Sequence, residues 1–136
     1  MAGYSGSPLL KKLGIKAEMH IHVKNPPGAY WDWLSPLPEG ITVADRPAKG
    51  KLDFVHLFVT QRKHFEQEYL RGRDWIKQNG MLWISWPKKS SGVETDLDGN
   101  IVREYGLRHG LVDVKVCAVD EIWSGLKFMY RLRDRK

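Results

Sequence analysis

The chain has 136 residues and a formal net charge of +6, with 42% apolar and 28% charged residues. This composition excludes a disordered chain, and no apolar run approaches the ~18 residues that a membrane span needs. The only cysteine, Cys117, excludes a disulfide framework and a multi-cysteine zinc site.

We expect a single α/β domain over residues 1–136, since this length suffices for one hydrophobic core. Residues 1–17 are expected to pack on it as an N-terminal segment, and residues 133–136 are expected to form a solvated basic tail. The first residues lack the apolar segment of a signal peptide. The sequence therefore predicts a cytoplasmic protein.

Three short elements are predicted in the first part of the chain. Residues 19–24 alternate apolar and polar side chains, as strands do, and residues 29–35 form a short helix that ends before two prolines. Residues 41–45 are a strand candidate. Only residues 46–52 connect this strand to the next one, and a parallel crossover usually needs more. It is either a short edge strand with a tight return or an antiparallel strand.

Two nearly continuous apolar runs, residues 53–60 and 81–86, predict the central strands of a sheet, because a strand covered on both faces has this pattern. Between them, residues 62–78 have apolar side chains at helical spacing. Asn79-Gly80 is expected to end that helix, since glycine tolerates the left-handed conformation of a C-cap.

The last third of the chain predicts a helix and a hairpin. The helix runs from a cap at Thr95 or Asp96 to about His109. Residues 111–119 and 125–132 each alternate apolar and polar side chains, and the short connection between them predicts an antiparallel pair. The whole pattern predicts a single three-layer, Rossmann-like, mostly parallel α/β sheet with a C-terminal antiparallel hairpin.

The order of these elements, β-α-β-β-α-β-α-β-β, resembles a shortened class I methyltransferase fold, in which the final strand lies antiparallel between its two predecessors. The resemblance implies an alternative function as a degenerate or minimal S-adenosylmethionine-dependent methyltransferase-like enzyme. Asp45 stands where that family has the acidic residue that holds the cofactor ribose. The loop Asn25-Pro26-Pro27-Gly28 departs from the family, whose first loop is rich in glycine.

Several short motifs resemble a bacterial family, the domain of unknown function numbered three thousand and fifty-two. They are residues 4–9 (YSGSPL), 11–14 (KKLG), 86–92 (WPKKSSG), 95–97 (TDL), 116–120 (VCAVD) and 123–126 (WSGL). The similarity covers most of the chain. It implies a small cytoplasmic bacterial protein with no assigned reaction.

A candidate anion site follows from the strand ends, because open parallel sheets bind ligands outside the carboxyl ends of their strands. The loop after the second buried strand offers two ammonium groups and two hydroxyls, which suit a phosphate or a carboxylate. A neighbouring strand ends at Thr60, and the resemblance to methyltransferases adds Asp45. The predicted site residues are Thr60, Lys88, Lys89, Ser90, Ser91 and Asp45.

Other reactive residues do not form a recognisable catalytic or metal site. His20 and His22 share a strand face, but no spacing supplies the further ligand that a metal needs. Cys117 lies in a strand and is expected to be a buried, inert thiol. We expect no resident cofactor or metal and leave open whether the chain is an enzyme. The leading hypothesis is a non-catalytic or accessory module that binds a small anionic ligand or a protein partner, without nucleic acid or membrane binding.

Overall fold

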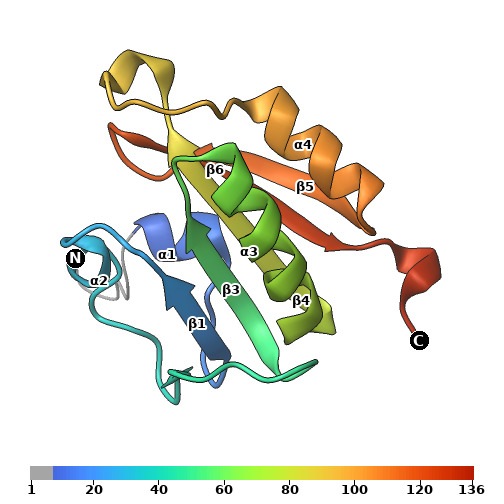
Figure 1. Ribbon diagram of the computed structural model, residues 1–136. Coiled ribbons are helices and arrows are strands. Elements are labelled where there is room, and N and C mark those ends of the chain that lie inside the picture. Colours follow the sequence, from blue (N-terminus) through green and yellow to red (C-terminus); the bar gives the residue numbers. More distant parts are fainter. Residues whose placement is uncertain (1–7) are drawn as a thin grey trace.

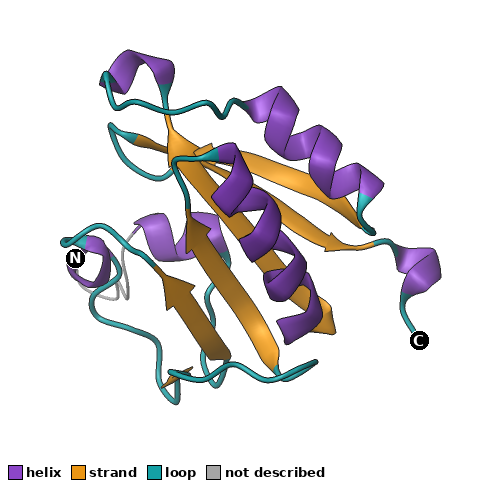
Figure 2. Ribbon diagram, viewed as in Figure 1, coloured by secondary structure: helices purple, strands orange, loops and turns teal. Residues whose placement is uncertain are grey.

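The computed structural model describes residues 8–136, which form one six-stranded sheet with helices on both faces (Figures 1 and 2). The strands are β1 (His20–Lys24), β2 (Thr42–Val43), β3 (Leu52–Phe58), β4 (Ile76–Pro87), β5 (Leu111–Ala118) and β6 (Trp123–Tyr130). The helices are α1 (Pro8–Leu13), α2 (Tyr30–Trp33), α3 (Arg62–Trp75) and α4 (Gly99–Arg108), with 3-10 turns η1 (Lys89–Ser91) and η2 (Leu132–Asp134). Residues 1–7, which begin the predicted N-terminal segment and the first family motif, lie outside the described residues.

The strand order is β2-β1-β3-β4-β6-β5. The first four of these strands pair in parallel, and β6 lies antiparallel between β4 and β5. The structure therefore confirms that the apolar runs at residues 53–60 and 81–86 belong to the central strands, β3 and β4. It also confirms that residues 112–119 and 125–132 form an antiparallel pair.

The strand predicted at residues 41–45 is a parallel edge strand of two residues, β2. Because β2 is so short, residues 44–51 suffice to return the chain to the amino edge of the sheet. There, the backbone N–H groups of Gly50 and Lys51 donate to carbonyl oxygens of Asp74 and Trp75 at 2.9 and 3.0 Å. The end of α3 thus fixes the start of β3.

Helices cover both faces of the sheet (Figure 2), and each face has its own hydrophobic core. On one face α3 and α4 pack on the sheet around Leu57, Phe65 and Phe128, all at most 1% exposed. On the other face the short helices α1 and α2 pack around Tyr30 and Trp83, both fully buried. Burial of both faces explains why β3 and β4 have almost continuous apolar sequences.

The end of α3 differs from the prediction. The helix ends at Trp75, and the chain passes directly into β4, because Ile76 is buried and pairs with Leu52. Gly80 lies within β4 and does not have a positive φ. A Cβ atom at Gly80 would lie 2.8 Å from the Leu52 carbonyl oxygen. This glycine therefore permits the close approach of two strands and does not cap the helix.

The side-chain alternation predicted for residues 111–119 is wrong beyond Asp113. The register of β5 against β6 shifts between Asp113 and Lys115, which is a β-bulge. Because β5 is also an edge strand, Val114 and Val116 are 53% and 68% exposed. These valines are therefore surface residues, whereas an unbroken alternation would put them on one face with Val112.

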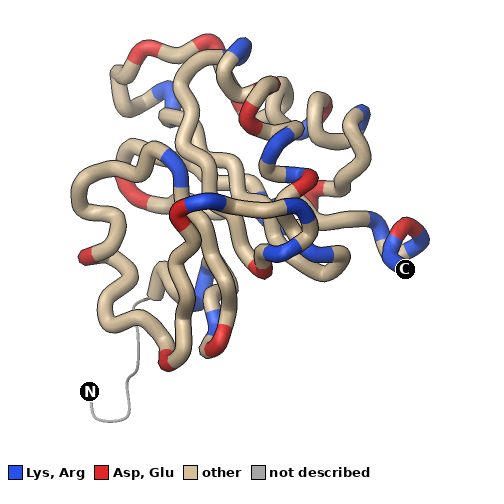
Figure 3. Tube along the Cα trace, turned by 60° about the horizontal axis from the view of Figure 1, so that its bottom comes forward, with Lys and Arg blue, Asp and Glu red and all other residues tan. Residues whose placement is uncertain are grey.

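The basic residues are distributed along the chain, with a group near the C-terminus (Figure 3). In the tail, Arg135 Nε donates to the Tyr130 carbonyl oxygen at 3.1 Å, whereas Leu132 is 79% exposed. None of the helices within residues 8–136 has the length and apolar character that crossing a bilayer would require.

Candidate functional site

The parallel strands β1, β3 and β4 end at the same edge of the sheet, the upper edge in Figure 1, whereas the two residues of β2 lie beside the start of β1. The chain turns from β1 outward to β2 and later from β2 back to β3, so the strand order reverses between β1 and β3. Ligands of open α/β sheets bind at the carboxyl edge beside such a reversal. The segments that follow β1, β3 and β4 at this edge are therefore the candidate site.

An open cleft of about 500 Å³ lies at this edge, beside the N-terminus of α3. Its lining residues are Thr60, Gln61, Lys63, Glu94, Thr95 and Asp96. Of the predicted anion-site residues, Thr60 alone lines it. The lining carries one ammonium group against two carboxylates, and this charge balance opposes a small anion in the cleft.

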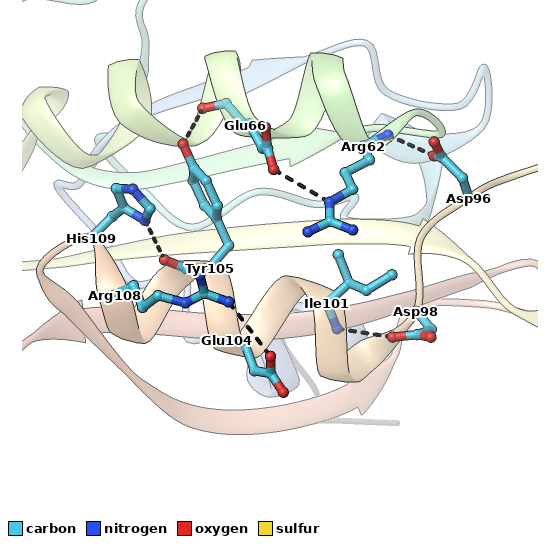
Figure 4. Close-up of polar contacts among 9 residues, drawn as sticks. All are labelled: Arg62, Glu66, Asp96, Asp98, Ile101, Glu104, Tyr105, Arg108 and His109. Carbon is cyan, nitrogen blue, oxygen red and sulfur yellow. Dashed lines mark hydrogen bonds and ion pairs between the residues drawn. The ribbon is translucent and has the colours of Figure 1, made fainter.

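Two hydrogen bonds among the lining segments join the segment before α4 to the β3–α3 turn. The Thr95 hydroxyl donates to the Thr60 carbonyl oxygen at 2.5 Å. The Asp96 carboxylate accepts the backbone N–H of Arg62, the first residue of α3, at 2.6 Å (Figure 4). Asp96 thereby stabilises a helix that is 34 residues away in the sequence.

Because Thr95 and Asp96 have these tertiary roles, neither caps α4, and that prediction is wrong. The N-cap of α4 is Asp98, whose carboxylate accepts the backbone N–H of Ile101 at 2.9 Å (Figure 4). The predicted C-terminal end holds, since Gly110 has a φ of 103° directly after the helix.

The loop after β4 contains four of the predicted site residues, Lys88, Lys89, Ser90 and Ser91. The Lys88 ammonium donates to the Asp120 carbonyl oxygen at 2.8 Å, and the Ser91 hydroxyl donates to the Lys88 carbonyl oxygen at 2.6 Å. The side chains of Lys89 and Ser90 are exposed and form no hydrogen bond or ion pair within residues 8–136. Lys88 and Ser91 therefore hold the loop in place, and Lys89 and Ser90 remain available to a ligand.

Asp45 follows β2 at the far side of the sheet, where its side chain is exposed. The loop after β1 begins with Asn25 at a φ of 57° and leads into α2, a helix of four residues. The N–H of Tyr30 donates to the Pro27 carbonyl oxygen at 3.0 Å. Neither Asp45 nor this loop contributes to the lining of the cleft beside α3.

A buried network of hydrogen bonds among three side chains was not predicted from the sequence. The Tyr30 hydroxyl lies 2.8 Å from Nδ1 of His56, and Nε2 of His56 lies 2.7 Å from the Ser85 hydroxyl. All three side chains are fully buried. Burial lowers the pKa of His56 to about 3 and raises the pKa of Tyr30. Because these side chains are not accessible to a substrate, the network has a structural role and holds α2 against β3 and β4.

The sequence does contain a signal for this buried hydrogen-bond network. His56 and Ser85 each interrupt an apolar run within a buried strand, and a polar side chain at such a position needs a buried partner. His56 also lies on the α2 face, whereas His22 contacts Trp75 on the α3 face. Within residues 8–136, no three His, Cys, Asp or Glu side chains gather in a way that could hold a metal ion.

Cys117 lies half-buried on the α1 face of β5. Burial raises the pKa of its thiol, while the nearby ammonium groups of Lys115, Lys12 and Lys127 oppose this effect. The raised pKa keeps the thiol protonated near neutral pH, so Cys117 lacks the activation of a catalytic nucleophile.

No protein-family model and no curated protein matches the sequence, so membership of the family of unknown function stays a prediction. Solved structures do match the fold. A SAM-dependent methyltransferase from Aquifex aeolicus aligns over 90% of this chain and 88% of its own, with 13% identity and a TM-score of 0.58. DhpI in complex with SAH aligns over 88% and 79%, with 12% identity and a TM-score of 0.60.

A third match is the magnesium protoporphyrin IX methyltransferase ChlM from Synechocystis PCC 6803 with bound SAM. It aligns over 90% of this chain and 74% of its own, with 8% identity and a TM-score of 0.58. In this chain the aligned fold is a mostly parallel sheet with the antiparallel strand β6 inserted near one edge. The chain therefore has the Rossmann-like fold of class I SAM-dependent methyltransferases.

Proposed function

We propose that this protein is a non-catalytic module that binds a small anionic ligand on a methyltransferase-like fold. The observation that supports this proposal is the exposed pair Lys89 and Ser90, held at the carboxyl edge by the hydrogen bonds of Lys88 and Ser91. An ammonium group and a hydroxyl on an anchored loop supply charge-assisted and neutral hydrogen bonds to a phosphate or a carboxylate.

The residues at the first loop do not fit S-adenosylmethionine. Pro26 and Pro27 have no backbone N–H, so two donors that a glycine-rich loop would present are missing. The four-residue helix α2 is too short to add a helix dipole behind this loop. Asp45, the residue that the resemblance assigns to the cofactor ribose, does not line the cleft beside α3.

Calorimetric titration with inorganic phosphate and with citrate tests the proposed anion site. Lys89→Gln combined with Ser90→Ala should weaken binding of whichever probe binds by about tenfold or more, because a charge-assisted hydrogen bond is lost. Lys49→Gln, which alters an exposed lysine on the β2–β3 connection, is the matched control and should leave binding unchanged. Equal affinity of the double variant and the parent protein would exclude the loop.

A second candidate function is that of a minimal SAM-dependent methyltransferase, and the observation in its favour is the antiparallel position of β6 between β4 and β5. If this function is right, S-adenosylmethionine should raise the melting temperature of the parent protein and not that of Asp45→Asn. Asparagine keeps the shape of the side chain but loses the carboxylate that would accept the ribose hydroxyls. No rise with the parent protein would contradict this second candidate.

A further inference from the structure

Two lysines face each other across the last pair of strands. In the register of β5 against β6, Lys115 lies directly opposite Lys127. Like charges at opposed positions of an antiparallel pair destabilise a sheet. The fold therefore keeps a repulsive pair at a position where a cross-strand partner of opposite charge would stabilise it.

Both lysines lie on the face that carries α1. The Lys115 ammonium donates to the carbonyl oxygen of Lys12, within α1, at 3.0 Å. The Lys127 ammonium lies 6.0 Å from the ring centroid of Trp83, whose Nε1–H donates to the Leu13 carbonyl oxygen at 2.9 Å. The pair thus lies beside α1, which itself carries Lys11 and Lys12.

Further ammonium groups act on the pair. Lys127 is half-buried, and burial together with the ammonium groups of Lys115 and Lys16 lowers its pKa. Lys12, Lys115 and Lys127 all act on the thiol of Cys117, which lies two residues from Lys115 on the same face. Within residues 8–136, no carboxylate forms an ion pair with any of the four lysines Lys12, Lys16, Lys115 and Lys127.

We propose that Lys12, Lys16, Lys115 and Lys127 form a binding site for an oligophosphate. Each ammonium group is a point charge with several donors, which is how lysine binds phosphate. A monovalent anion would neutralise one lysine and leave the repulsion of the others, whereas a linear oligophosphate spans both strands and α1. This site lies apart from the loop of Lys88–Ser91 and does not depend on it.

Cys117 is the only cysteine of the chain, so its alkylation by neutral iodoacetamide reports on this site alone. Tripolyphosphate, added at constant ionic strength, should slow alkylation by roughly threefold to tenfold. The bound anion neutralises the ammonium groups that lower the pKa of the Cys117 thiol, so that this pKa rises. Each unit of rise reduces the fraction of reactive thiolate, and with it the alkylation rate, about tenfold. A nucleoside triphosphate should act equally if the phosphate chain is what binds, and more strongly if the nucleoside also binds.

Lys115→Gln combined with Lys127→Gln should abolish the response to tripolyphosphate. Without a ligand, this variant should melt no lower than the parent protein, because it loses a repulsive pair. Lys49→Gln combined with Lys51→Gln alters two exposed lysines of the β2–β3 connection, outside both proposed sites, and is the matched control that should keep the full response. The proposal is overturned if saturating tripolyphosphate leaves the rate unchanged, if an equal ionic strength of sodium chloride reproduces the effect, or if the Lys49 and Lys51 variant loses the response as well.

Discussion

The hydroxyl oxygen of Tyr30 lies 2.8 Å from Nδ1 of His56, and neither side chain is exposed to solvent. This contact links α2 to β3 and continues through His56 to the Ser85 hydroxyl on β4. Three elements that are distant in the sequence are therefore joined by one chain of hydrogen bonds. A buried polar group that loses its partner retains its desolvation cost, so removing any one of the three side chains should lower the stability of the fold.

Tyr30→Phe should lower the free energy of unfolding by about 1–3 kcal/mol, because it leaves Nδ1 of His56 buried without a partner. Urea denaturation followed by circular dichroism measures the change. Tyr130→Phe is the control, since the Tyr130 hydroxyl donates to the Arg73 carbonyl oxygen at a partly exposed position. If both substitutions lower the free energy of unfolding by the same small amount, the buried Tyr30–His56 contact stabilises the protein no more than a partly exposed hydrogen bond does.

His56 should remain neutral in the folded protein at every pH from 8 down to about 4, because burial lowers its pKa to about 3. The unfolded chain takes up this proton near pH 6.5. The contribution of His56 is therefore fully present above pH 6.5 and is lost as the pH falls toward 3, at a slope of up to about 1.4 kcal/mol per pH unit. In an NMR titration, the ring signals of His56 should not move above pH 4. A midpoint near 6.5 would show that the ring is accessible to solvent.

Asp96→Ala should destabilise the protein by about 0.5–2 kcal/mol, the usual cost of losing an N-terminal helix cap, because its carboxylate accepts the Arg62 N–H at 2.6 Å. Glu94→Ala lies in the same segment and is the control. The Glu94 side chain is exposed and forms no hydrogen bond or ion pair within the described part of the chain, so its loss should change stability by no more than about 0.5 kcal/mol. Equal losses for the two variants would mean that Asp96 does not hold the start of α3.

Gly106→Ala should destabilise the protein by about 1–3 kcal/mol through overpacking. A Cβ atom at Gly106 would lie 2.6 Å from Cζ of Phe128, a fully buried ring beneath α4. Gly99→Ala is the matched control in the same helix, where the new Cβ would lie 3.6 Å from Trp86, an ordinary contact distance. A thermal melt in which Gly106→Ala equals Gly99→Ala would show that α4 moves away from the sheet at little cost.

The apolar patterns of the central strands were sufficient to predict the core of the fold. Residues 53–60 and 81–86 are apolar on both faces, and helices cover both faces of the sheet that they form. The end of α3 could not be predicted in the same way. Asn79-Gly80 is a good helix terminator by local rules, but the pairing of Ile76 with Leu52 ends the helix earlier. Tertiary strand pairing overrides the local preference here.

The candidate site was harder to predict, because the same polar residues can serve several roles. Thr95, Asp96 and Asp98 all suit a helix N-cap, and only the position of the β3–α3 turn decides that Asp98 takes that role. In the loop after β4, sequence alone does not separate Lys88, which holds the loop, from Lys89, which is exposed. These distinctions depend on distances between segments, which residue type and spacing do not determine.

The central claim is that this methyltransferase-like fold serves as a non-catalytic module. A calorimetric titration of the parent protein with S-adenosylhomocysteine tests it most directly, since that compound occupies the cofactor position without reacting. We predict no saturable heat up to about 1 mM, because the prolines after β1 remove donors that the cofactor needs. Saturable binding of one molecule per chain with a micromolar dissociation constant would contradict the claim and favour a minimal methyltransferase.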